Sequence, residues 1–276
     1  MEIQSCYGCE ARLAAWENSI MPNKAHGKLG GISTLLVCVA FCCIASCKRA
    51  SDDPLTRWEA IPEEPTQNAI LLQQAERSQC IWSVVQDAGT HRITIQQAAH
   101  ERSKEYQVRL QTETGVLVGT DNGEYGGGLI LTDDKRGLTK RLLDTNVLQL
   151  LPSKSGVLVF TGLLHLGVDE GAVWLYSKGS DGNWSIKKVA DLNGKPSVIS
   201  SANGNVLAVG GHGVSHLDQA LNLTEVTLPF AQVFPNSITE DVHGRIYVGM
   251  NAFVVRLVPA KTGYTHEWFT KPGCLR

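Results

Sequence analysis

Short apolar runs separated by polar, glycine-containing turns recur along the chain from about residue 108 onward. The clearest unit, residues 237–249, reads as a strand, an Asp-x-x-Gly turn at 241–244 and a second strand ending at Gly249. Similar units precede it, and their turn glycines are Gly115, Gly156, Gly204 and Gly244, separated by 41, 48 and 40 residues. Glycine tolerates positive φ and therefore suits a tight turn between antiparallel strands. The pattern predicts a repeated β-hairpin.

Two further apolar runs follow most of these hairpins. Third strands are expected at 129–131, 173–176 and 254–257, and fourth strands at 140–143, 186–189 and 223–227. A degenerate first copy is expected to pair 69–72 with 81–85. Four strands in about 40–45 residues is the period of a β-propeller blade. We therefore expect residues 68–276 to form an all-β domain, a β-propeller of about five blades of four antiparallel strands, with an irregular β-sandwich as the alternative.

The best-preserved unit carries a family resemblance. Residues 238–257, with Asp241, Gly244 and a strand ending in Tyr247-Val248-Gly249, are similar to the repeat of bacterial two-component-regulator propellers. The other copies keep the turn glycine and lack the aspartate. The resemblance implies a sensing or binding module.

The amino-terminal region has the layout of an export signal. Lys24 and Lys28 precede an uncharged run from Leu29 to Cys47, most of it apolar. The run ends in Ile44-Ala45-Ser46-Cys47, which resembles the bacterial lipobox, in which the cysteine receives a lipid. The resemblance implies a lipoprotein anchored to the membrane at Cys47, with Lys48 after it favouring the outer membrane. Residues 21–46 would be the signal peptide, and 47–67 the lipidated cysteine and a proline-rich, acidic tether.

Other interpretations of this segment remain open. The apolar run is about long enough for an uncleaved membrane-spanning helix, and a cysteine-rich core helix is a third reading. Met21 directly precedes the signal, and we expect it to be the true start, with Met1 as the alternative. If Met21 is the start, residues 1–20 are a leader outside the working protein.

Only two cysteines of the expected mature chain remain besides the anchor. Cys80 lies in the first expected blade and Cys274 follows the last. A propeller brings its first and last blades together, and an exported protein can form disulfides. We expect a Cys80–Cys274 bond that closes the ring, with two unpaired thiols as the alternative.

Charge and motifs narrow the function. The net charge of −2 gives no reason to expect a nucleic-acid partner. We find no nucleophile elbow, zinc-protease motif or phosphate-binding loop in the sequence, so no catalytic residue, metal ligand or cofactor is assigned.

Three expected loops hold the candidate binding residues. His212, His216 and Asp218 share one face if 210–218 is a strand, which is how a metal site could begin. The segment 162–171 is expected as a long loop that carries function. The glycine-rich loop 121–128 could bind a cation or approach a ligand closely. The binding candidates are Asp121, Glu124, Tyr125, His165, Asp169, His212 and His216.

These observations favour an extracytoplasmic binding module that is held at the membrane through Cys47. Its partner would dock on one end of the propeller, near 121–128, 162–171 and 210–216. A specific version binds and neutralises a periplasmic hydrolase or toxin, as immunity lipoproteins do. The alternatives are a propeller hydrolase of the lactonase type and an envelope assembly scaffold.

Overall fold

The computed structural model describes residues 53–98, 107–133 and 136–275. The expected signal peptide, the Cys47 anchor and the leader at 1–20 lie outside these residues. The described part of the chain contains no helix long and apolar enough to cross a membrane.

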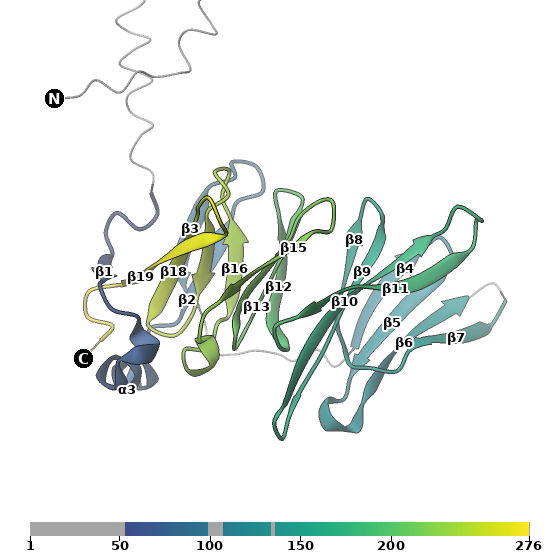
Figure 1. The fold of residues 1–276 in the computed structure, drawn as a ribbon, viewed down its shortest axis with the longest axis horizontal. Helices are drawn as coiled ribbons and strands as arrows, with labels where there is room; N and C mark the ends of the chain where they lie inside the picture. Colours follow the sequence, from purple (N-terminus) through teal and green to yellow (C-terminus); the bar gives the residue numbers. More distant parts are fainter. Residues whose placement is uncertain (1–52, 99–106, 134–135, 276) are drawn as a thin grey trace, which may run out of the picture. The chain divides into compact units, whose positions relative to one another are not determined.

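The described chain is an all-β fold built from consecutive antiparallel sheets (Figure 1). The first complete sheet contains β4 (Gln107–Thr112), β5 (Gly115–Asp121), β6 (Gly127–Asp133) and β7 (Leu138–Leu143). The second contains β8 (Val147–Ser153), β9 (Gly156–His165), β10 (Val168–Lys178) and β11 (Trp184–Leu192). The third contains β12 (Pro196–Ala202), β13 (Asn205–Gly210), β14 (Gly213–Leu217) and β15 (Leu223–Thr227).

The last sheet takes a strand from the beginning of the described chain. It contains β16 (Ser237–Glu240), β17 (Ile246–Gly249), β18 (Phe253–Pro259) and β19 (Tyr264–Thr270), with β1 (Glu59–Ile61) paired to β19 as a fifth strand. A separate hairpin contains β2 (Trp82–Gln86) and β3 (Ile93–Gln97). Each four-stranded sheet runs up and down in chain order, which is the architecture of β-propeller blades.

Apolar clusters lie between successive sheets. One joins Leu117 and Leu129 of the first sheet to Val159 and Tyr176 of the second. Equivalent clusters join the second sheet to the third, the third to the last, and the last to the β2–β3 hairpin. Side chains from both faces of the inner sheets are therefore buried, which explains the continuous apolar runs of β9, β13 and β17.

The first expected copy is corrected by the structure. Residues 69–72 belong to a helix, α3 (Ala69–Arg77), so only the β2–β3 hairpin represents this copy. Asn68 caps α3, because its side-chain oxygen accepts hydrogen bonds from the backbone N–H groups of Ile70 and Leu71 at 3.0 and 3.2 Å. The described blades are therefore four sheets of at least four strands and one two-stranded hairpin.

Part of the expected tether is also folded. Residues 59–61 form β1, Leu55 is buried, and Asp53 forms an ion pair with Arg256. Short 3-10 turns, η1 (Pro65–Gln67) and η3 (Phe230–Gln232), complete the connections. The folded domain thus begins before residue 68, because the apolar side chains at 55 and 61 pack beside the last sheet.

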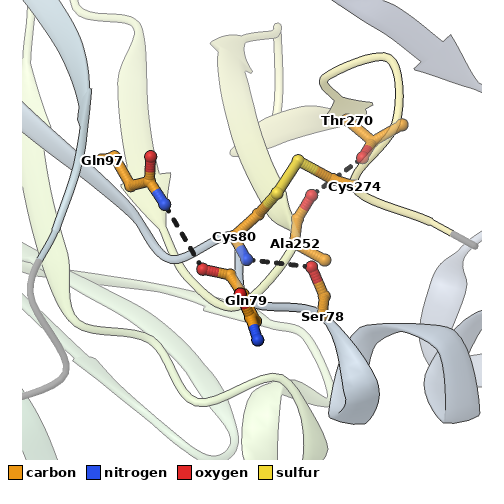
Figure 2. Close-up of a disulfide and its surroundings, with 7 residues drawn as sticks. All are labelled: Ser78, Gln79, Cys80, Gln97, Ala252, Thr270 and Cys274. Atoms are coloured by element: carbon orange, nitrogen blue, oxygen red, sulfur yellow. Dashed lines mark hydrogen bonds between the residues drawn. A yellow bond between two sulfur atoms is a disulfide. The ribbon is translucent and has the colours of Figure 1, made fainter.

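The disulfide between Cys80 and Cys274 is present in the structure, as the sequence predicts (Figure 2). Cys80 lies directly ahead of β2 and Cys274 follows β19, with their Cα atoms 5.7 Å apart. The Cys80 carbonyl also accepts a hydrogen bond of 2.7 Å from the backbone N–H of Ala252. The bond therefore fastens the β2–β3 hairpin to the last sheet.

The Asp-x-x-Gly turn between β16 and β17 is organised by its aspartate. One oxygen of the buried Asp241 carboxylate accepts hydrogen bonds from the backbone N–H groups of His243 and Arg245, at 2.9 and 3.0 Å. The other accepts from Arg245 Nε at 2.6 Å and from the Tyr247 hydroxyl at 3.3 Å. Gly244 has φ +74°, which is the conformation that the sequence pattern predicts for it.

Tyr247→Phe is expected to make the protein less sensitive to alkali. Burial, opposed by the charge of Arg245, raises the pKa of Tyr247 to about 12 from its ordinary 10.0. The folded state thus holds the hydroxyl proton more tightly than the unfolded chain does, and this stabilisation is complete below pH 10 and is lost as the pH rises towards 12. Between pH 9 and 12 the wild type should lose about 2 kcal/mol more free energy of unfolding than Tyr247→Phe.

Urea unfolding at several pH values measures this difference. At pH 7 the variant should cost about 1 kcal/mol, because Asp241 loses one donor. Tyr125→Phe is the matched control, because Tyr125 is exposed and removing its hydroxyl group should leave the wild-type alkaline profile unchanged. Parallel alkaline profiles for Tyr247→Phe and the wild type would contradict the account.

Candidate functional site

One end of the sheets gathers loops from several blades. In an up-and-down sheet, connections alternate between the two ends, so the loop between second and third strands lies at the same end as the link to the next sheet. We call this the crossover end. In the first three sheets its segments include 122–126, 144–146, 166–167, 193–195 and 211–212, and 228–236 and 250–252 continue it towards the last sheet. Most of the residues that the sequence singled out lie on these segments or beside them.

Lys195 links three blades at the crossover end. It lies in the connection between β11 and β12, and its ammonium group contacts Asp121 Oδ2 at 3.1 Å. Both side chains are largely buried, which strengthens the pair compared with an exposed one. The backbone N–H of Lys195 also donates to Asp169 Oδ1 at 2.6 Å. Lys195 therefore holds β5 of the first sheet and β10 of the second at the start of the third.

Two histidine–carboxylate pairs flank the β9–β10 hairpin. His165 Nε2 lies 3.0 Å from Glu124 Oε2 in the first sheet's loop, and His212 Nε2 lies 2.9 Å from Asp169 Oδ2. In the first pair the hairpin contributes the histidine, and in the second it contributes the carboxylate. The hairpin is thus connected through polar contacts to both neighbouring blades.

The 162–171 segment is a hairpin, which corrects the expected loop. β9 and β10 stay paired up to His165 and Val168, and only Leu166 and Gly167 form the turn (Figure 1). Gly171 pairs with Gly162, and a Cβ atom on Gly171 would lie 2.3 Å from the Gly194 carbonyl oxygen. The glycines that suggested a loop therefore permit close packing against the next connection.

The glycine-rich segment 121–128 is also well ordered by specific contacts. It contains the 3-10 turn η2 (Gly123–Tyr125), and Asn146 holds this turn by accepting from the Asn122 N–H at 3.2 Å and donating to the Gly123 carbonyl at 2.7 Å. A Cβ atom on Gly127 would lie 2.2 Å from the Thr120 carbonyl oxygen. Close backbone approach, one of the two roles considered for this segment, is thus satisfied by the protein itself.

The structure brings five of the seven candidate side chains into this network, and Tyr125 lies beside them with an exposed ring. The five are Asp121, Glu124, His165, Asp169 and His212. Sequence reasoning missed Lys195. Its position in Asn-Gly-Lys-Pro could have indicated it. This segment links two blades, and such a link must lie at the same end as the candidate loops.

His216 lies elsewhere, and the expected shared face of 210–218 is not formed. The strand β14 contains only 213–217, so His212 precedes it and Asp218 follows it. Asp218 stabilises its own turn by accepting from the backbone N–H groups of Ala220 and Asn222, both at 2.8 Å. The side-chain hydrogen bonds of Asn222, followed by those backbone bonds, lower the pKa of the Asp218 carboxyl group. Among the described residues, no group of three or more histidine, cysteine, aspartate or glutamate side chains is placed to hold a metal ion.

His216 belongs to a buried contact between the third and last sheets. Its Nε2 atom lies 3.7 Å from Glu240 Oε1, and its ring packs edge-on against Tyr264. Glu240 is 4% exposed and accepts a hydrogen bond of 2.9 Å from Asn205. This contact is near the opposite end of the blades, so His216 plays no part in the network around Lys195.

A surface hollow of about 670 Å³ lies at the opposite end of the first sheet. Its polar lining includes Thr112, Glu113, Asp133, Arg136 and Lys140, all from that one sheet. The crossover end instead combines charged groups from three blades. We therefore place the candidate site there and name it the Lys195 network: Asp121, Glu124, His165, Asp169, Lys195 and His212.

Comparisons with known proteins give distant structural likenesses. No family model matches the chain, and no curated protein matches it. A streptogramin B lyase structure is 15% identical, with 71% of this chain and 70% of that chain covered and a TM-score of 0.37. Virginiamycin B lyase from Staphylococcus aureus is 12% identical, with 70% and 71% covered and a TM-score of 0.37.

A third structure, the extracellular domain of a one-component system protein from B. thetaiotaomicron, is 12% identical, with 77% and 40% covered and a TM-score of 0.26. The chain thus spans less than half of that protein's length. Because every one of these TM-scores is below 0.5, the assignment of the sheets as consecutive β-propeller blades rests on their own strand order and pairing.

Proposed function

We propose that this protein is an extracytoplasmic binding module, lipid-anchored through Cys47, which binds a partner protein at its crossover end. The observation that carries the proposal is the Lys195 network, in which side chains from three blades fix three loops relative to one another. Loops fixed before binding lose little conformational freedom when a partner docks. The exposed Tyr125 ring beside the network is a side chain of the kind enriched in binding surfaces.

The anchor is proposed from the sequence pattern ending at Cys47. Lipid attachment there would keep the folded domain at a membrane surface outside the cytoplasm, where the Cys80–Cys274 bond is chemically stable. In the finer form of the proposal the partner is a periplasmic hydrolase or toxin that the module neutralises.

A photo-crosslinking residue at position 125, installed in the full chain in living cells, tests the binding surface. We expect a discrete protein adduct from position 125 and none from position 242, because Val242 is also exposed but lies in the β16–β17 turn at the opposite end. Intact mass of the extracted protein tests the anchor: a chain beginning at a lipidated Cys47 is expected, and Cys47→Ser should remain unprocessed.

Two results would overturn the proposal. Adducts from position 242 in place of 125 would put the binding surface at the wrong end, and the absence of adducts from both would remove the binding role. An unlipidated chain that begins at Met1 or Met21 would remove the anchor and leave the binding surface to be judged by its adducts.

One contact favours a second candidate, an enzyme of the propeller hydrolase type. His212 is half exposed, and Asp169 orients its imidazole in the way that a carboxylate orients a general base. In that case His212→Asn would abolish turnover of a small ester or lactone while Leu138→Asn at the opposite end would not. An envelope assembly scaffold has no comparable contact in its favour within the described residues.

A further inference from the structure

The tip of the β9–β10 hairpin exposes three aliphatic side chains. Leu166 at the turn is 90% exposed, and Leu164 and Val168 on either side are 64% and 44% exposed. Tyr125, 86% exposed, lies in the η2 turn. Glu124 of the same turn contacts His165 of the hairpin. Leu164 pairs with Asp169 and Val168 with His165, so these two side chains lie on opposite faces of the hairpin, on either side of Leu166. We call the three, with Tyr125, the apolar tip.

Leu166 occupies a conformation that does not suit leucine. Its φ is +44° and Gly167 follows with φ +88°, so the two-residue turn needs positive φ at both positions. Asparagine followed by glycine is the preferred pair for such a turn, and Asn203-Gly204 provides it between β12 and β13. A leucine here gains no burial in return for the unfavourable backbone. Strain of this kind at an exposed position points to a role in binding rather than in folding.

The apolar tip is held in place on both sides. Glu124 contacts His165 on the side of the first sheet, while His212 and the Lys195 N–H contact Asp169 on the side of the third. Aliphatic and aromatic side chains on a fixed support are efficient binding anchors, since the partner does not have to order them.

Negative charge surrounds the apolar tip. Asp121, Glu124, Asp169 and the exposed Glu170 contribute four carboxylates, and Lys195 contributes one positive charge, which leaves three negative charges while the histidines are neutral. The neighbouring pairs Arg141–Asp144 and Lys188–Asp191 each cancel. A partner surface that fits this region is therefore apolar at its centre and basic at its rim.

We infer that the apolar tip inserts into an apolar pocket with a basic rim on a partner protein. The inference rests on the proposed function and adds the chemistry of the partner. The same three negative charges disfavour binding to an anionic membrane surface. They would also repel the tip of a second copy of this chain.

The probe for this inference is a short synthetic peptide of alternating leucine and lysine, compared with its leucine–glutamate counterpart. Fluorescence anisotropy with the detergent-extracted full chain, corrected for detergent alone, should show at least about tenfold tighter binding of the lysine peptide. Leu166→Asn should weaken that binding by about tenfold. This variant removes the aliphatic side chain at the turn and places asparagine, which tolerates positive φ better than leucine, at position 166. Its melting temperature should therefore stay equal to the wild type's or rise.

Leu138→Asn is the control, because Leu138 is also an exposed leucine, at 62%, and lies at the opposite end of the first sheet. It should leave peptide binding unchanged. A Glu170→Gln variant should weaken binding of the lysine peptide and reduce its dependence on salt, since Glu170 is exposed beside the tip.

Several outcomes would overturn the inference. These are equal binding of the two peptides, unchanged binding by Leu166→Asn, Leu166-dependent flotation with phosphatidylcholine vesicles, and Leu166-dependent dimerisation in sedimentation. If any of these occurs while position 125 still gives a protein adduct in cells, the proposed function stands and only the chemistry assigned to the partner fails.

Discussion

Replacing both Cys80 and Cys274 by alanine is expected to lower the free energy of unfolding by about 3–5 kcal/mol. The two residues are 194 positions apart, so the bond restricts almost the whole folded domain in the unfolded state. The entropy of closing so long a loop gives the upper part of this range, and strain or residual structure lowers it.

The effect should be largest at the β2–β3 hairpin and the end of the last sheet, which the disulfide joins. The bond connects the segment ahead of β2 to the end of β19, near the Ser78 and Thr270 hydrogen bonds shown in Figure 2. Without it, the β2–β3 hairpin is held by the cluster around Trp82 and Phe269 and by hydrogen bonds to the last sheet, such as the one from the Val84 N–H to Ser237 Oγ at 2.9 Å. Hydrogen exchange of the hairpin amides should therefore accelerate more than exchange in β9 or β13.

Urea unfolding of the full chain under oxidising conditions measures the loss. The reduced wild type and the double variant should agree, and each single alanine variant should match the double variant. A double variant as stable as the oxidised wild type would show that the bond does not constrain the fold.

Local patterns predicted most of the strands, because the apolar and polar residues within each strand indicate which of its positions are buried. The third and fourth strands expected at 254–257 and 223–227 fall within β18 and coincide with β15. The fold class follows from their repetition at nearly constant spacing. The strand expected at 81–85 overlaps β2, but the one expected at 69–72 is wrong, because this apolar run fits a buried strand or a helix and Asn68 ahead of it was the signal for the helix.

The candidate site could be predicted only in part. Which loops share an end follows from strand alternation, and 122–126, 166–167 and 211–212 lie at one end. Which side chains meet depends on contacts between blades, and the Lys195 pair with Asp121 spans 74 positions of sequence. His216 was placed with His212 because both were assigned to one strand, whereas the turn at 211–212 ends one strand and begins another.

In three of the sheets, a glycine at or near the end of the second strand has a common structural role. A Cβ atom on Gly119 would lie 2.4 Å from Val147 Cγ1 of the next sheet, and one on Gly210 would lie 2.6 Å from the Lys195 carbonyl oxygen. At Gly249 it would lie 2.3 Å from the carbonyl oxygen of Trp82 in β2. The glycine that ends the Tyr-Val-Gly motif therefore lets the neighbouring hairpin approach β17 closely.

Gly249→Ala is consequently expected to destabilise the protein by about 3 kcal/mol, because a methyl group there can be accommodated only by moving backbone. Gly119→Ala should cost less, because its nearest obstacles are side-chain atoms of Val147 and Val108 rather than backbone atoms. Gly89→Ala is the matched control: its nearest neighbour would be 3.6 Å away, and its effect should stay within about 0.5 kcal/mol.

The order of these three losses in urea unfolding distinguishes close packing between blades from a general cost of replacing glycine. A general cost would make the three variants alike, whereas the geometry ranks Gly249 above Gly119 and Gly119 above Gly89. The Gly249 variant should also expose the β2–β3 hairpin to faster hydrogen exchange, because Trp82 must move away from β17. If Gly249→Ala behaves as Gly89→Ala does, β2 does not pack against the last sheet, and the place of the hairpin as the neighbouring blade is wrong.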